Sequence, residues 1–131
     1  PFPFAGAISH SACQAAVDIK AKAIIAFTQS GTTARLLSKY RPPVPIFAFT
    51  NVPETLRRLP LLWGTTPFLV GEVHSTDEMM HAVDEALVNL GLAKEGDMVV
   101  ITGAIPVARG LPTNMLKVHQ VGGLVPTSEV Q

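Results

Sequence analysis

The sequence predicts one α/β domain in which helices cover both faces of a largely parallel sheet. Its 131 residues are 47% hydrophobic and 15% charged, which suits a globular domain with a single buried core. The short apolar runs are continuous, a pattern typical of strands that are covered on both faces. Segments of helical period separate these runs, so helical crossovers join the strands. The residues alone indicate four or five strands.

The first half of the chain predicts helices and buried strands in alternation. Apolar residues recur at helical spacing from Ile8 onwards, and the apolar run KAIIAF follows them. The prolines after Arg41 end the next helix, and Pro53 suits the first turn of another. We expect helices over residues 7–21, 32–40 and 53–59, and strands over residues 22–27 and 45–49.

The second half predicts one well-marked helix and three strands. Ser75 and Glu78 have the spacing of a capping box, and Gly91 suits the C-terminal cap of the same helix. The last apolar run, MLKVHQV, alternates with polar residues, which indicates an edge strand. We expect strands over residues 66–70, 98–102 and 115–121. We expect a boundary segment at residues 1–6, the domain at residues 7–122 and a frayed tail at residues 123–131.

Composition excludes several classes of protein. Ten Lys and Arg residues balance ten Asp and Glu residues, so the net charge gives no strong field for nucleic acid or an anionic membrane. The single cysteine excludes a disulfide framework and a cysteine-rich zinc site, and it fits a cytoplasmic protein. The histidines show no metal-ligand spacing, and no apolar run is long enough to cross a membrane.

The segment TQSGTT after the first strand predicts an anion site. It joins a buried strand to a helix N-terminus, where backbone N–H groups and the helix dipole favour a phosphate. The alternative is a well-capped turn without a ligand, since Ser and Thr are good N-caps. The chain has neither a Walker A lysine nor a GxGxxG motif, which disfavours an NTPase or a dinucleotide-binding fold. The candidate residues are Thr28, Gln29, Ser30, Gly31, Thr32 and Thr33.

Residues 103–114 could complete this site at the same edge of the sheet. They include Arg109 and Gly110, and an arginine on a flexible loop can close over a second phosphate. The alternative is a solvated arginine in a connection. Cys13 would need His10 as a base to act as a nucleophile, and its alanine-rich helix favours a packed thiol instead. The residues therefore predict no self-contained catalytic site and no metal site.

The run SGTTARLLSKYRP (residues 30–42) resembles the phosphate-binding loop and following helix of the C-terminal domain of pyruvate kinases. Other stretches follow in the order of that family, including PIFAFT, LPLLWGTTPFLV and the long run from STDEMM to LKVHQVG. The resemblance covers residues 7–122. It implies a three-layer α/β/α fold with a five-stranded, mostly parallel sheet, whose last strand is antiparallel at the edge.

The resemblance also implies a role. In that family this domain carries an allosteric effector site and a subunit interface of a tetramer. A separate barrel domain transfers a phosphoryl group from phosphoenolpyruvate to ADP in glycolysis, with Mg²⁺ and usually K⁺. Residues 28–33 match the loop that binds an effector phosphate, and Arg109 and Gly110 lie in the loop that closes over the ligand. The resemblance thus implies a regulatory domain without catalysis or a cofactor of its own.

The effector is left open by a departure from the family pattern. Fructose-bisphosphate-regulated eukaryotic members carry a tryptophan and an arginine near the start of the fourth helix, and residues 72–83 have neither. A sugar monophosphate or AMP is therefore at least as good a candidate as fructose 1,6-bisphosphate. Two other functions also stay open. One is a structural module that only assembles subunits, and the other is a stand-alone small hydrolase that uses Cys13 or Ser30.

Overall fold

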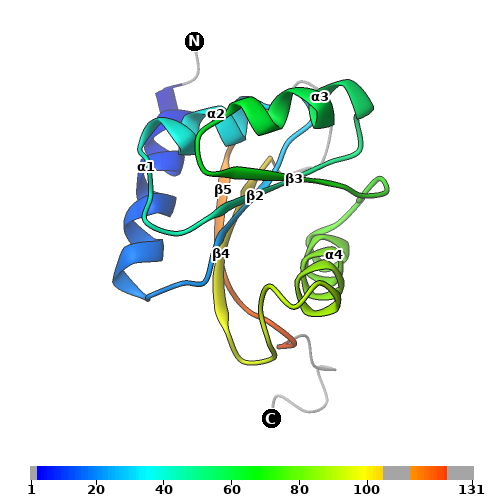
Figure 1. Ribbon diagram of the computed structural model, residues 1–131. Coiled ribbons are helices and arrows are strands. Elements are labelled where there is room, and N and C mark those ends of the chain that lie inside the picture. Colours follow the sequence, from blue (N-terminus) through cyan, green and yellow to red (C-terminus); the bar gives the residue numbers. More distant parts are fainter. Residues whose placement is uncertain (1–2, 105–112, 124–131) are drawn as a thin grey trace.

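The computed structural model describes residues 3–104 and 113–123, which form a five-stranded sheet with helices on both faces (Figure 1). The strands lie in the order β3-β2-β1-β4-β5. Neighbouring strands are parallel except β4 and β5, which are antiparallel. The predicted fold class and the antiparallel edge strand are confirmed. The strands are β1 (Ile24–Phe27), β2 (Ile46–Thr50), β3 (Thr65–Leu69), β4 (Met98–Gly103) and β5 (Met115–Gln120).

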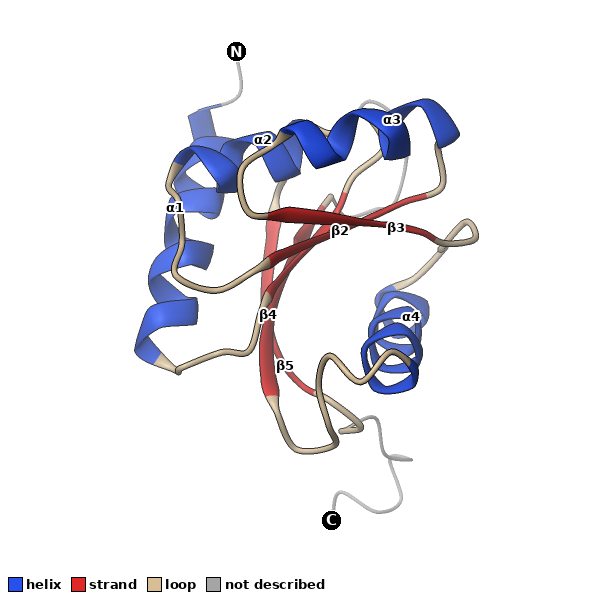
Figure 2. Ribbon diagram, viewed as in Figure 1, coloured by secondary structure: helices blue, strands red, loops and turns tan. Residues whose placement is uncertain are grey.

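The helices form two outer layers (Figure 2). One face of the sheet packs against α1 (Pro3–Asp18) and α2 (Thr32–Lys39), with α3 (Pro53–Arg58) and its 3₁₀ extension (Leu59–Leu61) beside them. The other face packs against α4 (Thr76–Asn89). Each layer encloses its own apolar core, because strands that are buried on both faces need cover on both.

Helix α1 begins and ends earlier than the predicted range of residues 7–21. Pro3 occupies the first turn, where its missing N–H is no loss. At the other end Lys20 adopts a left-handed φ of 56°, and the Ala21 N–H bonds the Ala16 carbonyl at 2.9 Å. This is the bonding pattern of a Schellman motif, formed here by a lysine instead of the usual glycine. The helix therefore ends where the sequence contains no conventional stop residue.

Helix α4 has the two ends that the sequence predicts. The Ser75 hydroxyl accepts a hydrogen bond of 3.1 Å from the Glu78 N–H, which is one half of the predicted capping box. The Glu78 carboxylate instead accepts from the N–H of His74, one residue before the cap. Gly91 adopts a φ of 69°, and the Leu92 N–H bonds the Leu87 carbonyl at 2.8 Å, so a second Schellman motif ends α4.

The two edges of the sheet differ. Pro67 lies within edge strand β3, where it removes a backbone donor and makes the edge a poor template for pairing. Edge strand β5 contains no proline and exposes Lys117 and Val118. A partly buried contact of 2.8 Å between His119 Nε2 and Asp84 Oδ1 joins β5 to α4. The β5 edge is thus the better-formed template for another strand.

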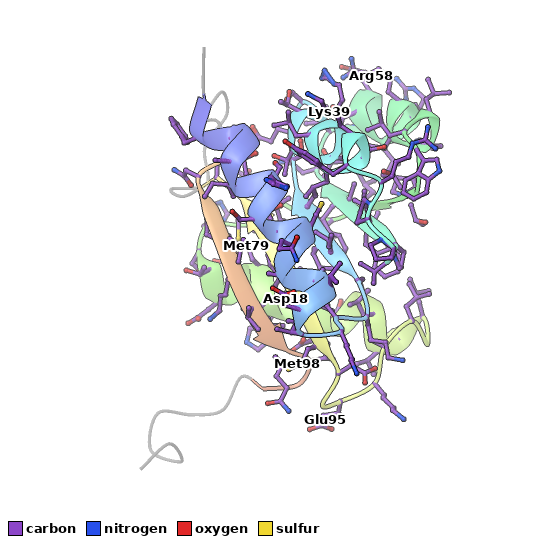
Figure 3. All side chains as sticks on the ribbon, turned by 90° about the vertical axis from the view of Figure 1, so that its left-hand side faces the viewer. Asp18, Lys39, Arg58, Met79, Glu95 and Met98 are labelled. Carbon is purple, nitrogen blue, oxygen red and sulfur yellow. The ribbon has the colours of Figure 1, made fainter. Side chains whose placement is uncertain are left out.

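Charge is unevenly distributed although the net charge is zero. Residues 32–58, which include α2 and α3, contain five Lys and Arg residues and one Glu. Helix α4 contains four Asp and Glu residues and no Lys or Arg. Lys39 and Arg58 lie at the same end of the molecule in Figure 3, away from Glu95. The α2–α3 region and α4 therefore carry opposite charge on opposite faces of the sheet.

No helix among residues 3–104 and 113–123 is long and apolar enough to cross a membrane. The frayed tail that we expect after Gly122 falls largely on residues 124–131, outside the described residues.

Candidate functional site

The chain reverses its winding direction between β1 and β4. From β1 it continues to β2 and β3 on one side, and α4 then carries it back to β4 on the other side. Open α/β sheets bind ligands outside the carboxyl ends of the strands at such a point. A Cβ on Gly103, the last residue of β4, would lie 3.2 Å from the Phe27 Cβ, so glycine lets the two strand ends approach closely. Residues 28–33 lie at this point.

Thr28 and Gly31 shape the turn between β1 and α2. Thr28 is buried, and its Oγ1 accepts a hydrogen bond of 2.8 Å from the Gly31 N–H. Gly31 is the N-cap of α2 with a φ of 92°, a conformation that favours glycine. No side-chain hydrogen bond of the N-cap residue closes this helix end. The first-turn N–H groups of an α-helix have no intrahelical partner, so this helix end offers donors at the edge where an anion would bind.

Ser30 and Thr32 expose their hydroxyl groups beside this helix end. Their oxygens lie 2.9 Å apart, and Ser30 Oγ also accepts a long bond of 3.4 Å from the Thr32 N–H. Hydroxyls that are exposed and paired with each other can turn their protons toward an anion without leaving a buried partner unsatisfied. Ser30 and Thr32 are therefore the two candidate residues whose hydroxyls are best placed to reach a ligand.

The hydroxyl of Thr33 is engaged within the fold. It is buried and hydrogen-bonded to the buried hydroxyl of Thr113. Only Asn114 separates Thr113 from β5, so this contact joins the start of α2 to the segment just before β5. The sequence places Thr113 in the expected loop but gives no sign of its partner, because the contact joins residues 80 positions apart.

Gln29 contacts α3 through its backbone. The Thr55 hydroxyl donates to the Gln29 carbonyl, a contact that sequence reasoning missed because it depends on how α3 packs. The side-chain oxygen Oε1 of Gln29 is buried and has no hydrogen-bond partner among the described residues. A buried acceptor without a donor is costly, so a ligand hydroxyl that reached Gln29 would satisfy it.

The remaining candidates lie apart from the turn or outside the described residues. Arg109 and Gly110 fall within residues 105–112, which the structure does not describe. Cys13 is buried in the core of α1 and α2, and burial raises the pKa of its thiol. His10 stacks on Tyr40 with ring centroids 4.9 Å apart, so its ring packs against an aromatic side chain. The burial of Cys13 and its raised pKa agree with a packed thiol.

Two further findings on the described residues concern places other than the turn. No three His, Cys, Asp or Glu side chains in residues 3–104 and 113–123 gather into a metal-binding group. A shallow hollow of about 340 Å³ lies between the end of β3 and α4, lined by apolar residues together with Glu85 and Asn89. It contains no cation, so the turn after β1 remains the best candidate for an anion site.

The comparisons with known proteins agree on one family. The family model described as pyruvate kinase, alpha/beta domain, matches residues 6–119. The pyruvate kinase of Mycobacterium tuberculosis is 42% identical over 117 residues, which cover 89% of this chain and 25% of that protein. The pyruvate kinase of Geobacillus stearothermophilus is 40% identical over 119 residues, which cover 91% of this chain and 20% of that protein.

The solved structures give the same result for the fold. A crystal structure of a pyruvate kinase from Cryptosporidium parvum superposes with a TM-score of 0.80 at 30% sequence identity. The match covers 89% of this chain and 22% of that one. The chain thus spans between a fifth and a quarter of the length of these relatives. The family match and the shared fold together show that this chain belongs to the pyruvate kinase C-terminal alpha/beta domain family.

Proposed function

We propose that the chain is the effector-binding and subunit-assembly domain of a pyruvate kinase, and that it has no catalysis of its own. The parent enzyme would transfer a phosphoryl group from phosphoenolpyruvate to ADP, and the groups that hold Mg²⁺ and K⁺ would lie in its barrel domain. The observation that carries the effector proposal is the turn at residues 28–33, which presents helix N–H groups and two exposed hydroxyls at the switch point of the sheet. The same proposal places the protein in the cytoplasm.

The ligand class follows from the donors and acceptors at the turn. First-turn N–H groups with the hydroxyls of Ser30 and Thr32 suit a phosphate group. A phosphate monoester meets these donors, and the resemblance supports a sugar phosphate or an AMP-type nucleotide as the effector.

A calorimetric titration with AMP, glucose 6-phosphate and fructose 1,6-bisphosphate tests this proposal. Replacing the two exposed hydroxyls, in Ser30→Ala with Thr32→Ala, should weaken phosphate-ligand binding about tenfold or more, since bonds to a charged group contribute about 1.5–3 kcal/mol each. The matched control is Ser11→Ala with Thr66→Ala, which also removes two exposed hydroxyls but lies on α1 and β3. This control should bind like the wild type.

Arg109 and Gly110 stay in the proposed site on the strength of the resemblance. Arg109→Ala should weaken fructose 1,6-bisphosphate more than glucose 6-phosphate, because only the former needs a second cation. Failure of the wild type to bind all three ligands at millimolar concentration would favour a purely structural assembly module. Magnesium-dependent formation of pyruvate by the purified chain would contradict the absence of catalysis.

A further inference from the structure

Among the described residues, α4 is the only helix on its face of the sheet, whereas α1, α2 and α3 lie on the other (Figure 2). Neighbouring strands lie about 4.8 Å apart, so five strands span about 19 Å, and a helix with its side chains is about 10–12 Å wide. One helix therefore leaves part of this face without a neighbouring element. The hollow of about 340 Å³ lies at the flank of α4, beside the end of edge strand β3.

The walls of this hollow are apolar. Ala82 and Ala86 lie one turn apart on α4, and their short side chains leave a space that larger residues would fill. Leu69, the last residue of β3, is 56% exposed, although its side chain is large and apolar. A ligand that covered these side chains would remove apolar surface from water. The apolar residues of the lining are Leu69, Val70, Ala82 and Ala86.

Two polar side chains of α4 border these walls. Glu85 and Asn89 are exposed and lie one turn apart, and neither side chain makes a hydrogen bond or an ion pair with a described residue. The Glu78 carboxylate on the same helix, by contrast, accepts from the N–H of His74. The hollow thus combines apolar walls with a carboxylate and an amide oxygen, both of which can accept hydrogen bonds from an ammonium group.

The charge of α4 favours a cation in this hollow. The helix contains four Asp and Glu residues and no Lys or Arg, and Glu85 is the one charged residue of the lining. A metal ion is a poor fit, since hard cations need several oxygen ligands and no three acidic, His or Cys side chains gather in the part of the chain that the structure describes. An organic cation, by contrast, can use the apolar walls as well as the carboxylate.

The size of the hollow favours a small molecule over a segment of another protein. The lining residues of α4 extend from Ala82 to Asn89, which is about 10 Å along the helix axis. This length is too short to hold a partner helix or strand. The volume lies near the lower end of the range of about 300–1,000 Å³ that small-molecule sites occupy.

We propose that this hollow is a second binding site of the domain and that it takes a small organic ammonium compound. The apolar body of the ligand packs against Leu69 and the two alanines, and its ammonium group donates to Glu85 and Asn89. Strand β2 separates this hollow from the turn after β1. The inference goes beyond the proposed function, since this site takes a cation and the turn takes an anion.

The test compares three probes of similar shape in titrations of this chain, followed by amide NMR shifts. Benzylamine, which is cationic at neutral pH, should bind with a millimolar dissociation constant and shift the amides of Val70, Ala82 and Ala86. Neutral benzyl alcohol should bind about threefold more weakly, because exposed ion pairs contribute little, and anionic benzoate more weakly still. Added salt should narrow the difference between benzylamine and benzyl alcohol, since salt screens exposed charges.

Two variants test the carboxylate and the walls. Glu85→Gln should bind benzylamine about as weakly as benzyl alcohol, and its matched control is Glu54→Gln, an exposed glutamate on α3 that should bind like the wild type. Ala86→Leu should fill the hollow and weaken the binding of both probes about tenfold or more. Its control is Ala7→Leu, which enlarges an exposed alanine on α1. Urea unfolding shows whether each variant is folded.

The inference is wrong if benzyl alcohol or benzoate binds the wild type as tightly as benzylamine does, because the hollow would then not select a cation. It is also wrong if no probe gives a saturable shift at the hollow, or if a folded Ala86→Leu binds benzylamine like the wild type. If Ala86→Leu does not fold, Glu85→Gln decides, since undiminished binding of benzylamine by this variant contradicts the role of the carboxylate. Each of these outcomes leaves the phosphate proposal at the turn to its own titrations.

Discussion

Cys13 shows how burial sets the chemistry of a single residue. The thiol lies in the apolar core between α1 and α2, where the thiolate would be poorly solvated, and this burial raises its pKa. A thiolate is the form that attacks electrophiles. The fold therefore protects Cys13 from the oxidation and alkylation that exposed cysteines undergo.

This burial predicts a pH dependence of folding. Above the ordinary thiol pKa the unfolded chain loses the Cys13 proton while the folded chain keeps it, so the free energy of unfolding falls as the pH rises toward the folded pKa. Urea unfolding from pH 7 to pH 10 should show a steeper fall for the wild type than for Cys13→Ala. Equal slopes for the two proteins would mean that Cys13 has an ordinary pKa in the folded state.

The hydroxyls of the turn show what a sequence can indicate at the scale of residues. The run TQSGTT marks the turn, because hydroxyls and a glycine between a strand and a helix have a local meaning. It does not separate Ser30 and Thr32, which are exposed, from Thr28 and Thr33, which are engaged in the fold. That division depends on Thr113, whose position follows from the packing of the whole sheet.

At the scale of elements, the chain turns out of α1 at Lys20, in a left-handed conformation that is unfavourable for a lysine. A left-handed φ costs an L-residue about 1–2 kcal/mol, and glycine avoids this cost. Lys20→Gly should therefore raise the free energy of unfolding by about 0.5–1 kcal/mol, measured by urea denaturation. Lys22→Gly is the matched control, since it removes the same charge where φ is not left-handed, and it should not stabilise the protein. Stabilisation by both changes would point to charge instead of backbone strain.

The boundaries of the elements follow local stop signals where these exist. Ser75 and Gly91 mark α4 correctly, because capping depends on residues close in sequence. The end of α1 is missed, since a lysine in a glycine position leaves no pattern to find. The start of α1 is missed as well, because Pro3 is compatible with a first turn but does not require one. Tertiary packing decides both ends.

At the scale of the whole molecule, the β5 edge predicts self-association. We expect two copies to pair through this edge for two reasons. The β5 strand has no proline such as the one that removes a backbone donor from β3, and β5 exposes Val118. Val118→Lys should raise the dissociation constant about fivefold or more, measured by sedimentation at rising concentration, since like charges would face each other across the pair.

Val88→Lys provides the control for this prediction. Val88 is 47% exposed and Val118 is 42% exposed, so the two changes add the same charge at similarly exposed valines. Val88 lies on α4, away from the strand edge, and its change should leave association as it is in the wild type. A wild type that stays monomeric at high concentration would contradict the proposed edge pairing.

The architecture as a whole could be predicted further than the site. Continuous apolar runs that alternate with helices require a covered parallel sheet, and the alternation in MLKVHQV indicates its edge. The strand order and the switch point between β1 and β4 do not follow from these patterns. The resemblance to a known family supplied the five-stranded, mixed sheet. The contacts of Thr55 and Thr113 required the structure, since each joins residues far apart in the sequence and no local pattern predicts such a pair.

The molecule has no net charge, but α4 and the α2–α3 region carry opposite charges, so its electric field has a positive side and a negative side. A small anion that approaches in solution is attracted toward Arg35, Arg58 and their neighbours and repelled from α4, before any hydrogen bond forms. Such steering acts on the rate of encounter more than on the lifetime of the complex. Stopped-flow measurements with glucose 6-phosphate should therefore give an association rate constant that falls as ionic strength rises, with little change in the dissociation rate constant. A neutral molecule with evenly mixed charges would show no such dependence.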